Sequence, residues 1–574
     1  MTAAKATRFA RLPDYGDDDV PVSRGSTLVL DGGGKPHNGA VRGGVIVDEP
    51  ERERAPLPHE FDEQLRDELG VPAAALPDDV EAAPAVVAAA ETKRAMRGLF
   101  GRDSAYLVVA ASQSALAALS IPITTRLLGT QFAVITTSLA VMQVLVAVGL
   151  FSLPTAIQRN YREADGGRSA RRTITLAIIT AAITLVVAYS TGPLWAPALG
   201  LGAFSAPLRY AVIWASLTAV TFASVALLRS RNVFRAYALI SFVQSFLAEV
   251  FSVLLVVFVR RSAAEFIFGE MLMQIVAAVL GLYMTRPLPL RRRDRQLVVT
   301  SLKYAAGLLP AAVAGFLLTA SDRIVIHHDL PADHYIQVAR YGAVYNIASI
   351  PILLLGLLDP VWLPRFFSLK DSGLRGRLIA DSRDVLLRLL IPTVLGLGLG
   401  VPLVLAVWLP GSYHPSGLVL TVVTISAGAF PMAGYMSANR VLLISGRTAP
   451  VGLCMVLGAG FNIAANIVLV PRLGIEGAAV STSAAYIVLL VLGTLFARRI
   501  QRLRQPSAAL LVGSAVAIAA AMSCTVLPAT GVFAVARGVL TLGCVVVALG
   551  VLRSVISDGA ARTPSRLRRR AARP

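Results

Sequence analysis

The sequence has few charged residues for its length. Asp, Glu, Lys and Arg together make up 15% of the 574 residues, whereas an average soluble protein has about 25%. Hydrophobic residues make up 55% of the chain, and the mean hydropathy is +0.66. This composition excludes an ordinary soluble domain. It predicts an all-α protein that crosses a membrane many times, because apolar runs long enough to span a bilayer recur along the chain.

Cysteine and histidine are also scarce. The three cysteines, Cys454, Cys524 and Cys544, lie far apart within apolar segments, which argues against a disulfide framework and a zinc site. The stretch HHDLPADH (327–334) contains residue types that can bind metals. Because its spacing defines no coordination geometry, we predict no metal site, and the sequence also indicates no cofactor and no catalytic residues.

Basic and acidic residues are unevenly distributed. Residues 1–95 carry 18 acidic and 11 basic residues, whereas the remainder carries 16 acidic and 43 basic residues. The bases of the remainder lie in short loops between apolar runs, as in membrane proteins whose cytoplasmic loops are basic. We therefore predict no nucleic-acid partner.

The first 95 residues form an acidic segment that is rich in Pro, Gly and Ala. This composition predicts a disordered cytoplasmic tail without a signal peptide. Phe61, Leu65 and Leu69 recur every four residues, which predicts a short amphipathic helix. That helix is either a docking segment for a cytoplasmic partner or a transient helix without one.

Fourteen apolar spans follow the tail. Each is expected to be a helix, because backbone groups that face lipid must bond within their own segment. They lie at about 104–125, 131–155, 174–192, 207–228, 236–259, 264–284, 302–321, 340–363, 385–408, 417–439, 449–471, 476–497, 508–527 and 532–554.

The charges of the loops alternate along this series. Loops after even-numbered spans contain 24 basic residues, and loops after odd-numbered spans contain 8. Since basic loops stay in the cytoplasm, both termini are predicted to be cytoplasmic. The basic C-terminal tail, residues 556–574, is expected to contact anionic lipid headgroups.

A few ionisable residues interrupt the apolar spans. Unpaired charge is costly within a membrane, so such residues are candidates for function. Glu249, Glu270 and Asp359 are the candidates for ion coupling. Glu249 and Glu270 could alternatively form a structural pair that holds two neighbouring helices together.

Two asparagines share one face of the eleventh span. Asn462 and Asn466 are four residues apart, so they lie on the same side of a helix. The next span begins with small residues, Gly477 to Ser483, which allow two membrane helices to approach closely. The asparagines are therefore expected to face either a polar cavity or a neighbouring helix.

Four stretches resemble a known family. ITTRLLGTQFAVITTSLAVMQVLVAVGL (123–150), LLPAAVAGFLLTASDRIVI (308–326), RYGAVYNIASIPILLLGLLDPVWLPRF (340–366) and NIAANIVLVPRLGIEGAAVSTSAAY (462–486) resemble segments of polysaccharide flippases. Those proteins belong to the multidrug/oligosaccharidyl-lipid/polysaccharide exporter superfamily. The resemblance extends from residue 104 to about 500, and the acidic tail departs from the family pattern.

The resemblance implies two lobes of six helices, related by an approximate two-fold axis along the membrane normal. It implies alternating access through a central cavity and a lipid-linked oligosaccharide as cargo. The expected segments are the tail 1–95, the N-terminal lobe 96–285, a linker 286–301, the C-terminal lobe 302–500, two additional helices 501–555 and the tail 556–574.

An anionic pyrophosphate link in the cargo would need a cation on its path. Arg126 and Arg323 end the first and seventh spans, and arginine can grip phosphate oxygens in pairs. Alternatively, Arg323 pairs with Asp322 and Arg126 reaches the outer headgroups. The predicted substrate-binding residues are Arg126, Asp322, Arg323, Asn346, Asn462 and Asn466.

The expected function is therefore export of a lipid-linked oligosaccharide across the plasma membrane, and not enzymatic catalysis. Possible partners are a polysaccharide polymerase and glycosyltransferases. Three alternatives remain: a drug or small-solute antiporter, a membrane glycosyltransferase or polymerase, and a scaffold without transport. The short outer loops argue against the enzyme, and the span count argues against the antiporter.

Overall fold

The computed structural model describes residues 119–162, 165–330, 334–356, 362, 366 and 371–557. The predicted acidic tail, its amphipathic helix, the basic C-terminal tail and Asp359 lie outside these residues. The described residues all belong to one compact unit, which is the subject of everything below.

Helices and the loops that join them make up the described residues, which contain no β-strand. The predicted all-helical fold is therefore confirmed. Residues 119–128 are helical, and a positive φ of 54° at Gly129 begins the turn that leads into the next helix. The first half of the unit, which we name the N-lobe, comprises helix 119–128 and the helices α4 (Phe132–Leu150), α5 (Leu153–Tyr161), α6 (Gly166–Ser190), α7 (Gly192–Ala198), α8 (Ala206–Ser230), α9 (Phe234–Phe242), α10 (Ala248–Phe258) and α11 (Ala263–Thr285), with the short 3-10 helix η2 (Gly129–Gln131) and the π-helix η3 (Val243–Leu247).

Longer helices form the second half of the unit. The short 3-10 helix η4 (Arg292–Asp294) precedes them, and η5 (Gly411–Tyr413) and η6 (Pro415–Leu418) follow the helix that ends at Trp408. We name the helices from Arg295 to Arg498 the C-lobe. They are α12 (Arg295–Asp329), α13 (His334–Ala348), α15 (Ser372–Trp408), α16 (Val419–Ala427), α17 (Ala429–Ile444), α18 (Thr448–Leu473) and α19 (Ile475–Arg498), and two further helices follow, α20 (Ala508–Ser523) and α21 (Gly531–Ser557).

Eleven of the described helical segments are long and apolar enough to cross a membrane, or twelve if the bent pair Tyr335–Ala348 and Ile350–Gly356 is one span. The described residues therefore do not confirm the predicted count of fourteen transmembrane helices. Most of the first predicted span lies outside the described residues. The thirteenth corresponds to α20, whose 16 residues extend about 24 Å at 1.5 Å per residue, less than the thickness of a bilayer core.

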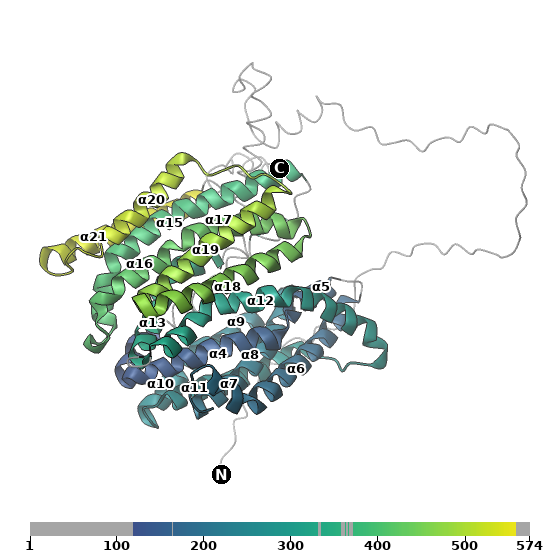
Figure 1. Ribbon diagram of the computed structural model, residues 1–574. Coiled ribbons are helices and arrows are strands. Elements are labelled where there is room, and N and C mark those ends of the chain that lie inside the picture. The colour runs from purple at the N-terminus through teal and green to yellow at the C-terminus, as the bar shows by residue number, and fades with distance from the viewer. Residues whose placement is uncertain are drawn as a thin grey trace, which may run out of the picture. The chain divides into compact units, whose positions relative to one another are not determined.

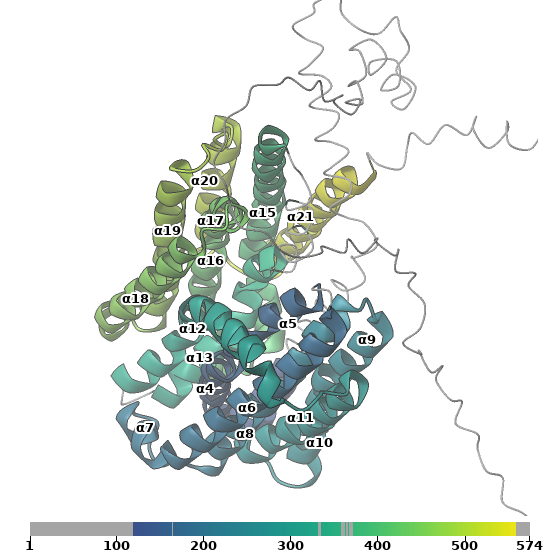
Figure 2. The ribbon, with the colours of Figure 1, turned by 90° about the vertical axis from the view of Figure 1, so that its right-hand side faces the viewer.

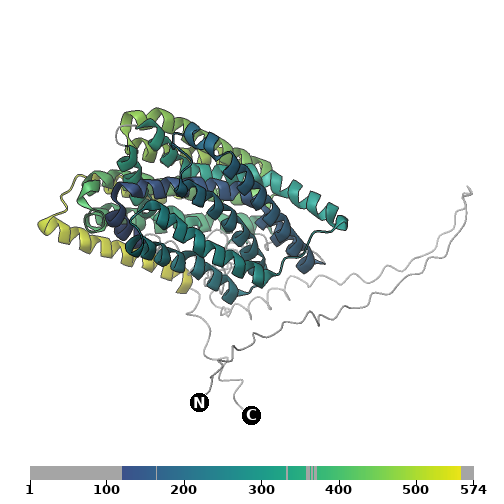
Figure 3. The same ribbon diagram turned by 90° about the horizontal axis from the view of Figure 1, so that it is seen from below.

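The two lobes meet along α12 and α13. Figure 1 shows the N-lobe helices on one side and α15 to α21 on the other, and Figure 2 shows α12 and α13 between the two groups. Seen from below, the long helices run side by side (Figure 3). α12 packs against α18 and also against α4, so it joins the two lobes.

The largest apolar cluster contains residues of both lobes. Ile121 and Phe132 of the N-lobe lie in one cluster with Leu405, Leu418 and Ile475 of the C-lobe. The remaining clusters of the described residues lie mostly within one lobe. The lobes are therefore held together by apolar packing along α12 and α13 and at the end where the loop after Gly129 and the loop after α15 meet.

Candidate functional site

A cavity of about 250 Å³ lies between the two lobes. The N-lobe contributes helix 119–128, α4, α8, η3, α10 and α11, and the C-lobe contributes α12 and α13. Four predicted site residues line it together, namely Glu249, Glu270, Arg323 and Asn346. The cavity is thus a polar chamber among apolar helices, where charged groups are expected to have a function.

Two carboxylates occupy the N-lobe side of this cavity. Ser120 donates a hydrogen bond to Glu249, and the Ser252 hydroxyl lies 3.4 Å from Oε1 of Glu270. The two carboxylates are also near enough to interact electrostatically. Each carboxylate therefore has a single hydroxyl partner among the contacts of the described residues, which leaves oxygen lone pairs available to a proton or a cation.

Arg323 supplies the positive charge of the cavity. Its guanidinium carbon lies 4.5 Å from the centre of the Tyr345 ring, and Nη1 donates to the Thr319 carbonyl at 3.3 Å. The residue is 8% exposed, and among the residues that the structure describes its Nε has no hydrogen-bond partner. A buried guanidinium with unused donors can bind an anion, because charge-assisted hydrogen bonds are strong in a low dielectric.

Asp322, the neighbour of Arg323, belongs to a different environment. Its carboxylate is fully buried and accepts hydrogen bonds from Tyr341 at 2.6 Å, Asn466 at 2.7 Å and Thr482 at 2.8 Å. The described contacts contain no ion pair between Asp322 and Arg323. Neutral donors from α13, α18 and α19 therefore satisfy this carboxylate.

Asn462 and Asn466 extend the same network. The Asn462 carbonyl oxygen accepts from Ser321 at 3.0 Å and from Asn466 at 3.2 Å. Both amides are fully buried, and neither lines the cavity. Of the two expected environments, the structure thus places the pair against a neighbouring helix, where it links α18 to α12 and α19.

Arg126 lies away from the cavity, at the end where the lobes meet. Its guanidinium donates to the carbonyl groups of Val407 and Trp408, the last residues of α15. Tyr413, which follows α15, donates from its hydroxyl to the Gly129 carbonyl at 2.7 Å. We name these contacts the inter-lobe latch. Burial raises the pKa of the Tyr413 phenol, so the group stays protonated and remains a donor.

The structure differs from the sequence analysis in the environment of the two arginines and in the end of the seventh helix. Arg126 and Arg323 have matching sequence positions, but they contact different surroundings. In addition, α12 does not end at residue 321 but continues to Asp329, so Asp322 and Arg323 lie inside the helix.

The polar stretch after the seventh span contains local contacts. Nδ1 of His328 lies 2.7 Å from Oδ1 of Asp329, and His327 contacts the edge of the Tyr335 ring. Asp333 lies outside the described residues. Within the described part of the chain, no three His, Cys, Asp or Glu side chains are grouped so as to hold a metal ion.

Several polar residues of the site escaped the sequence analysis. Gln143 lines the cavity, as does Gln244, whose polarity within an apolar span was evident from the sequence. Tyr341 and Thr482 bind Asp322. A glutamine within an apolar span is a detectable signal. A threonine among small residues is not, because Ser and Thr occur widely in membrane helices.

Residues 100–370 match the family described as polysaccharide biosynthesis protein. The lipid II flippase MurJ in an inward closed conformation is 13% identical, with a TM-score of 0.60, and the match covers 79% of this chain and 99% of that chain. A variant of the Vibrio cholerae MATE transporter VcmN is 15% identical, with a TM-score of 0.55 and coverage of 71% and 97%. An outward-facing multidrug resistance MATE family transporter of the MOP superfamily is 14% identical, with a TM-score of 0.51 and coverage of 71% and 95%. No curated protein matches the sequence significantly.

Proposed function

Because this chain has the fold of the multidrug/oligosaccharidyl-lipid/polysaccharide exporter superfamily, we propose that it is a flippase for a lipid-linked oligosaccharide. The proposal places the protein in the plasma membrane, with both termini in the cytoplasm, and assigns it to the synthesis of a cell-surface polysaccharide. The family match of residues 100–370 supports a glycan rather than a drug as cargo.

The observation that carries the proposal is the combination of charges in the cavity. Arg323 offers donors to an anion, and Glu249 and Glu270 lie in the same chamber. A polyprenyl pyrophosphate is an anion that needs a cation on its path through a low dielectric. Asn346 and the glutamines offer hydrogen bonds to sugar hydroxyls.

The same residues suggest how ion binding is coupled to transport. While both carboxylates are ionised, the charges of the cavity sum to a negative value, which repels an anionic cargo. When a proton or a cation occupies the carboxylates, Arg323 is free to bind the pyrophosphate. Alternating access follows if the inter-lobe latch opens in one of these two states and stays closed in the other.

Reconstituted liposomes test the proposal. The full chain is incorporated with a fluorescent polyprenyl-pyrophosphate oligosaccharide, and a membrane-impermeant quencher reports how fast the probe changes leaflet. We expect faster exchange than in protein-free liposomes, and slower exchange after Arg323→Ala. Exchange that equals the protein-free rate, together with transport of a cationic dye, would instead indicate an antiporter.

A further inference from the structure

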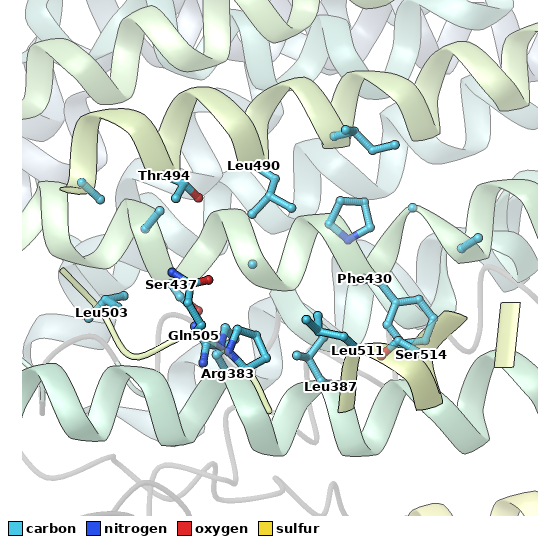
Figure 4. A pocket seen from close by; sticks show the side chains of 18 of the residues that line it. Arg383, Leu387, Phe430, Ser437, Leu490, Thr494, Leu503, Gln505, Leu511 and Ser514 are labelled. Atoms are coloured by element: carbon cyan, nitrogen blue, oxygen red, sulfur yellow. The ribbon is translucent and has the colours of Figure 1, made fainter. Parts of the chain in front are cut away.

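A second cavity, larger than the one between the lobes, lies outside the candidate site. It has a volume of about 520 Å³ and lies within the C-terminal half, between α15, α17, α19 and α20. Figure 4 shows it from close by. We name it the C-terminal slot. Its volume falls within the range of pockets that hold small organic molecules, about 300–1,000 Å³.

The walls of the slot are mostly apolar. Leu387, Phe430, Ile487, Leu490 and Ile518 line it together with small residues of α17. Protein interiors rarely contain voids much larger than a water molecule, and water does not fill an apolar cavity stably. A chamber of this size at membrane depth is therefore expected to contain hydrocarbon.

The slot opens to the surroundings of the helices. Ile487 on α19 is 53% exposed and Leu511 on α20 is 54% exposed, and both belong to the lining. Because α17 and α19 are spanning helices, their surroundings at this depth are lipid chains. A chain can thus enter sideways, without passing through the transport cavity.

One end of the slot is polar and basic. Ser437, Thr494 and Gln505 gather there with Arg383, while Phe430 and Leu511 lie toward the other end (Figure 4). Among the described residues, the lining contains two charged side chains, Arg383 and Arg498, and no acidic one.

The two arginines differ in how their charge is compensated. Arg383 binds Oδ1 of Asp384 through both Nε and Nη2, at 3.0 and 2.8 Å. Arg504 binds Asp381 and Asp384 at 2.9 and 2.7 Å, so these four side chains carry no net charge. Arg498, at the exposed end of α19, is therefore the cation that the slot offers to a ligand.

We propose that the C-terminal slot binds an anionic phospholipid, with one acyl chain between α17, α19 and α20 and the phosphate near Arg498. We choose an anionic lipid because its phosphate group complements the charge of Arg498. A basic residue near an anionic bilayer surface contributes about 1 kcal/mol to the binding free energy. The predicted topology places this end in the cytoplasmic leaflet. The proposal does not depend on the cargo or on transport.

Photo-crosslinking tests the proposal. The full chain is placed in phosphatidylcholine vesicles that contain a small fraction of phosphatidylglycerol with a photoreactive acyl chain. Labelled peptides are mapped by mass spectrometry and compared with those from an equally reactive phosphatidylcholine. We expect the peptides of α19 and α20 to be labelled about fivefold more by phosphatidylglycerol, which corresponds to the ~1 kcal/mol of one arginine.

Three variants sharpen the result. Arg498→Ala should reduce the labelling by phosphatidylglycerol to the phosphatidylcholine level. Arg472→Ala, at an exposed arginine near the end of α18, serves as the matched control and should change nothing. Ser514→Phe should fill the slot and reduce labelling by both lipids, and melting curves of the purified variants establish that each is folded.

Equal labelling by the two lipids, or labelling spread evenly over all exposed helices, would contradict the proposal. Preferential labelling of the slot by a photoreactive polyprenyl phosphate, with no preference for phosphatidylglycerol, would identify an isoprenoid site instead. An unchanged lipid preference in Arg498→Ala would exclude the assigned position of the phosphate.

Discussion

Removing a single oxygen atom tests the inter-lobe latch. In Tyr413→Phe, the ring remains, and the hydrogen bond to the Gly129 carbonyl is lost. This bond exists only while the two lobes touch at this end, so the substitution destabilises the closed state relative to the open one. A neutral hydrogen bond contributes about 0.5–1.5 kcal/mol net, which predicts a shift of the equilibrium toward opening by about two- to twelvefold.

Arg126→Ala should shift the same equilibrium further. The Arg126 guanidinium binds two carbonyl groups at the end of α15, where the partial negative charge of the helix dipole lies. Hydrogen bonds that involve a charged group contribute about 1.5–3 kcal/mol. Arg126→Lys keeps the positive charge but loses the planar set of guanidinium donors. Its open population should therefore lie between those of the wild type and Arg126→Ala.

Distances between spin labels measure the shift. Labels at Ser205 and Arg472 report the separation of the N-lobe and the C-lobe on the side that the charge pattern predicts to be outside. The native cysteines are replaced first. We expect the population with the longer distance to grow in Tyr413→Phe and to grow more in Arg126→Ala. Tyr283→Phe is the control, because Tyr283 is 70% exposed and its loss should leave the distances unchanged.

The reasoning fails if the distance distribution of Tyr413→Phe equals that of the wild type. It also fails if the shorter distance gains population. A lower melting temperature without a change in the distances would mean that the latch stabilises the fold and does not gate it.

The remaining predictions concern the cavity and the packing of the helices. The rate of oligosaccharide exchange in liposomes should decrease from wild type to Arg323→Lys to Arg323→Ala, and the control Arg472→Ala should keep the wild-type rate. Equal rates for all four proteins would mean that Arg323 does not contact the cargo during transport. Glu249→Gln and Glu270→Gln should retain lipid exchange but lose its dependence on an ion gradient, and a variant that keeps the full dependence would not carry the coupling ion. Gly477→Leu should lower the free energy of unfolding by at least about 1–3 kcal/mol in thermal denaturation, because a Cβ at this position would overlap the backbone of α18; an unchanged melting temperature would contradict this packing.

The helices were largely predictable from the sequence because lipid permits few backbone conformations. Apolar runs therefore located most of the described helices, including α18 and α19. The short loop and the small residues also predicted that α18 and α19 approach each other closely. This approach requires Gly477, because a Cβ there would overlap the backbone of α18. The ends of the helices were less predictable, because a span predicted from hydropathy stops at the first charged residue even where the helix continues. α12 continues past Asp322, since three neutral donors satisfy that carboxylate within the protein.

The environment of a polar side chain was harder to predict than its presence. The spacing of Asn462 and Asn466 predicted one shared face, but the partners on that face come from α12 and α19. In the sequence, Arg126 and Arg323 have equivalent positions, because each follows an apolar span. Their roles differ because the end of α15 lies beside Arg126 and the cavity lies beside Arg323, and neither neighbour is close in sequence.

The contrast between Asp322 and Arg323 explains why the cavity keeps a usable positive charge. Consecutive residues of a helix point about 100° apart, since 3.6 residues complete one turn. Asp322 points toward α13, α18 and α19, where Tyr341, Asn466 and Thr482 supply its hydrogen bonds. Because uncharged groups satisfy the carboxylate, Arg323 does not need to pair with it and can face the cavity. If α13, α18 and α19 lacked these donors, the buried carboxylate would need the adjacent guanidinium, and the cavity would lose the cation that an anionic cargo requires.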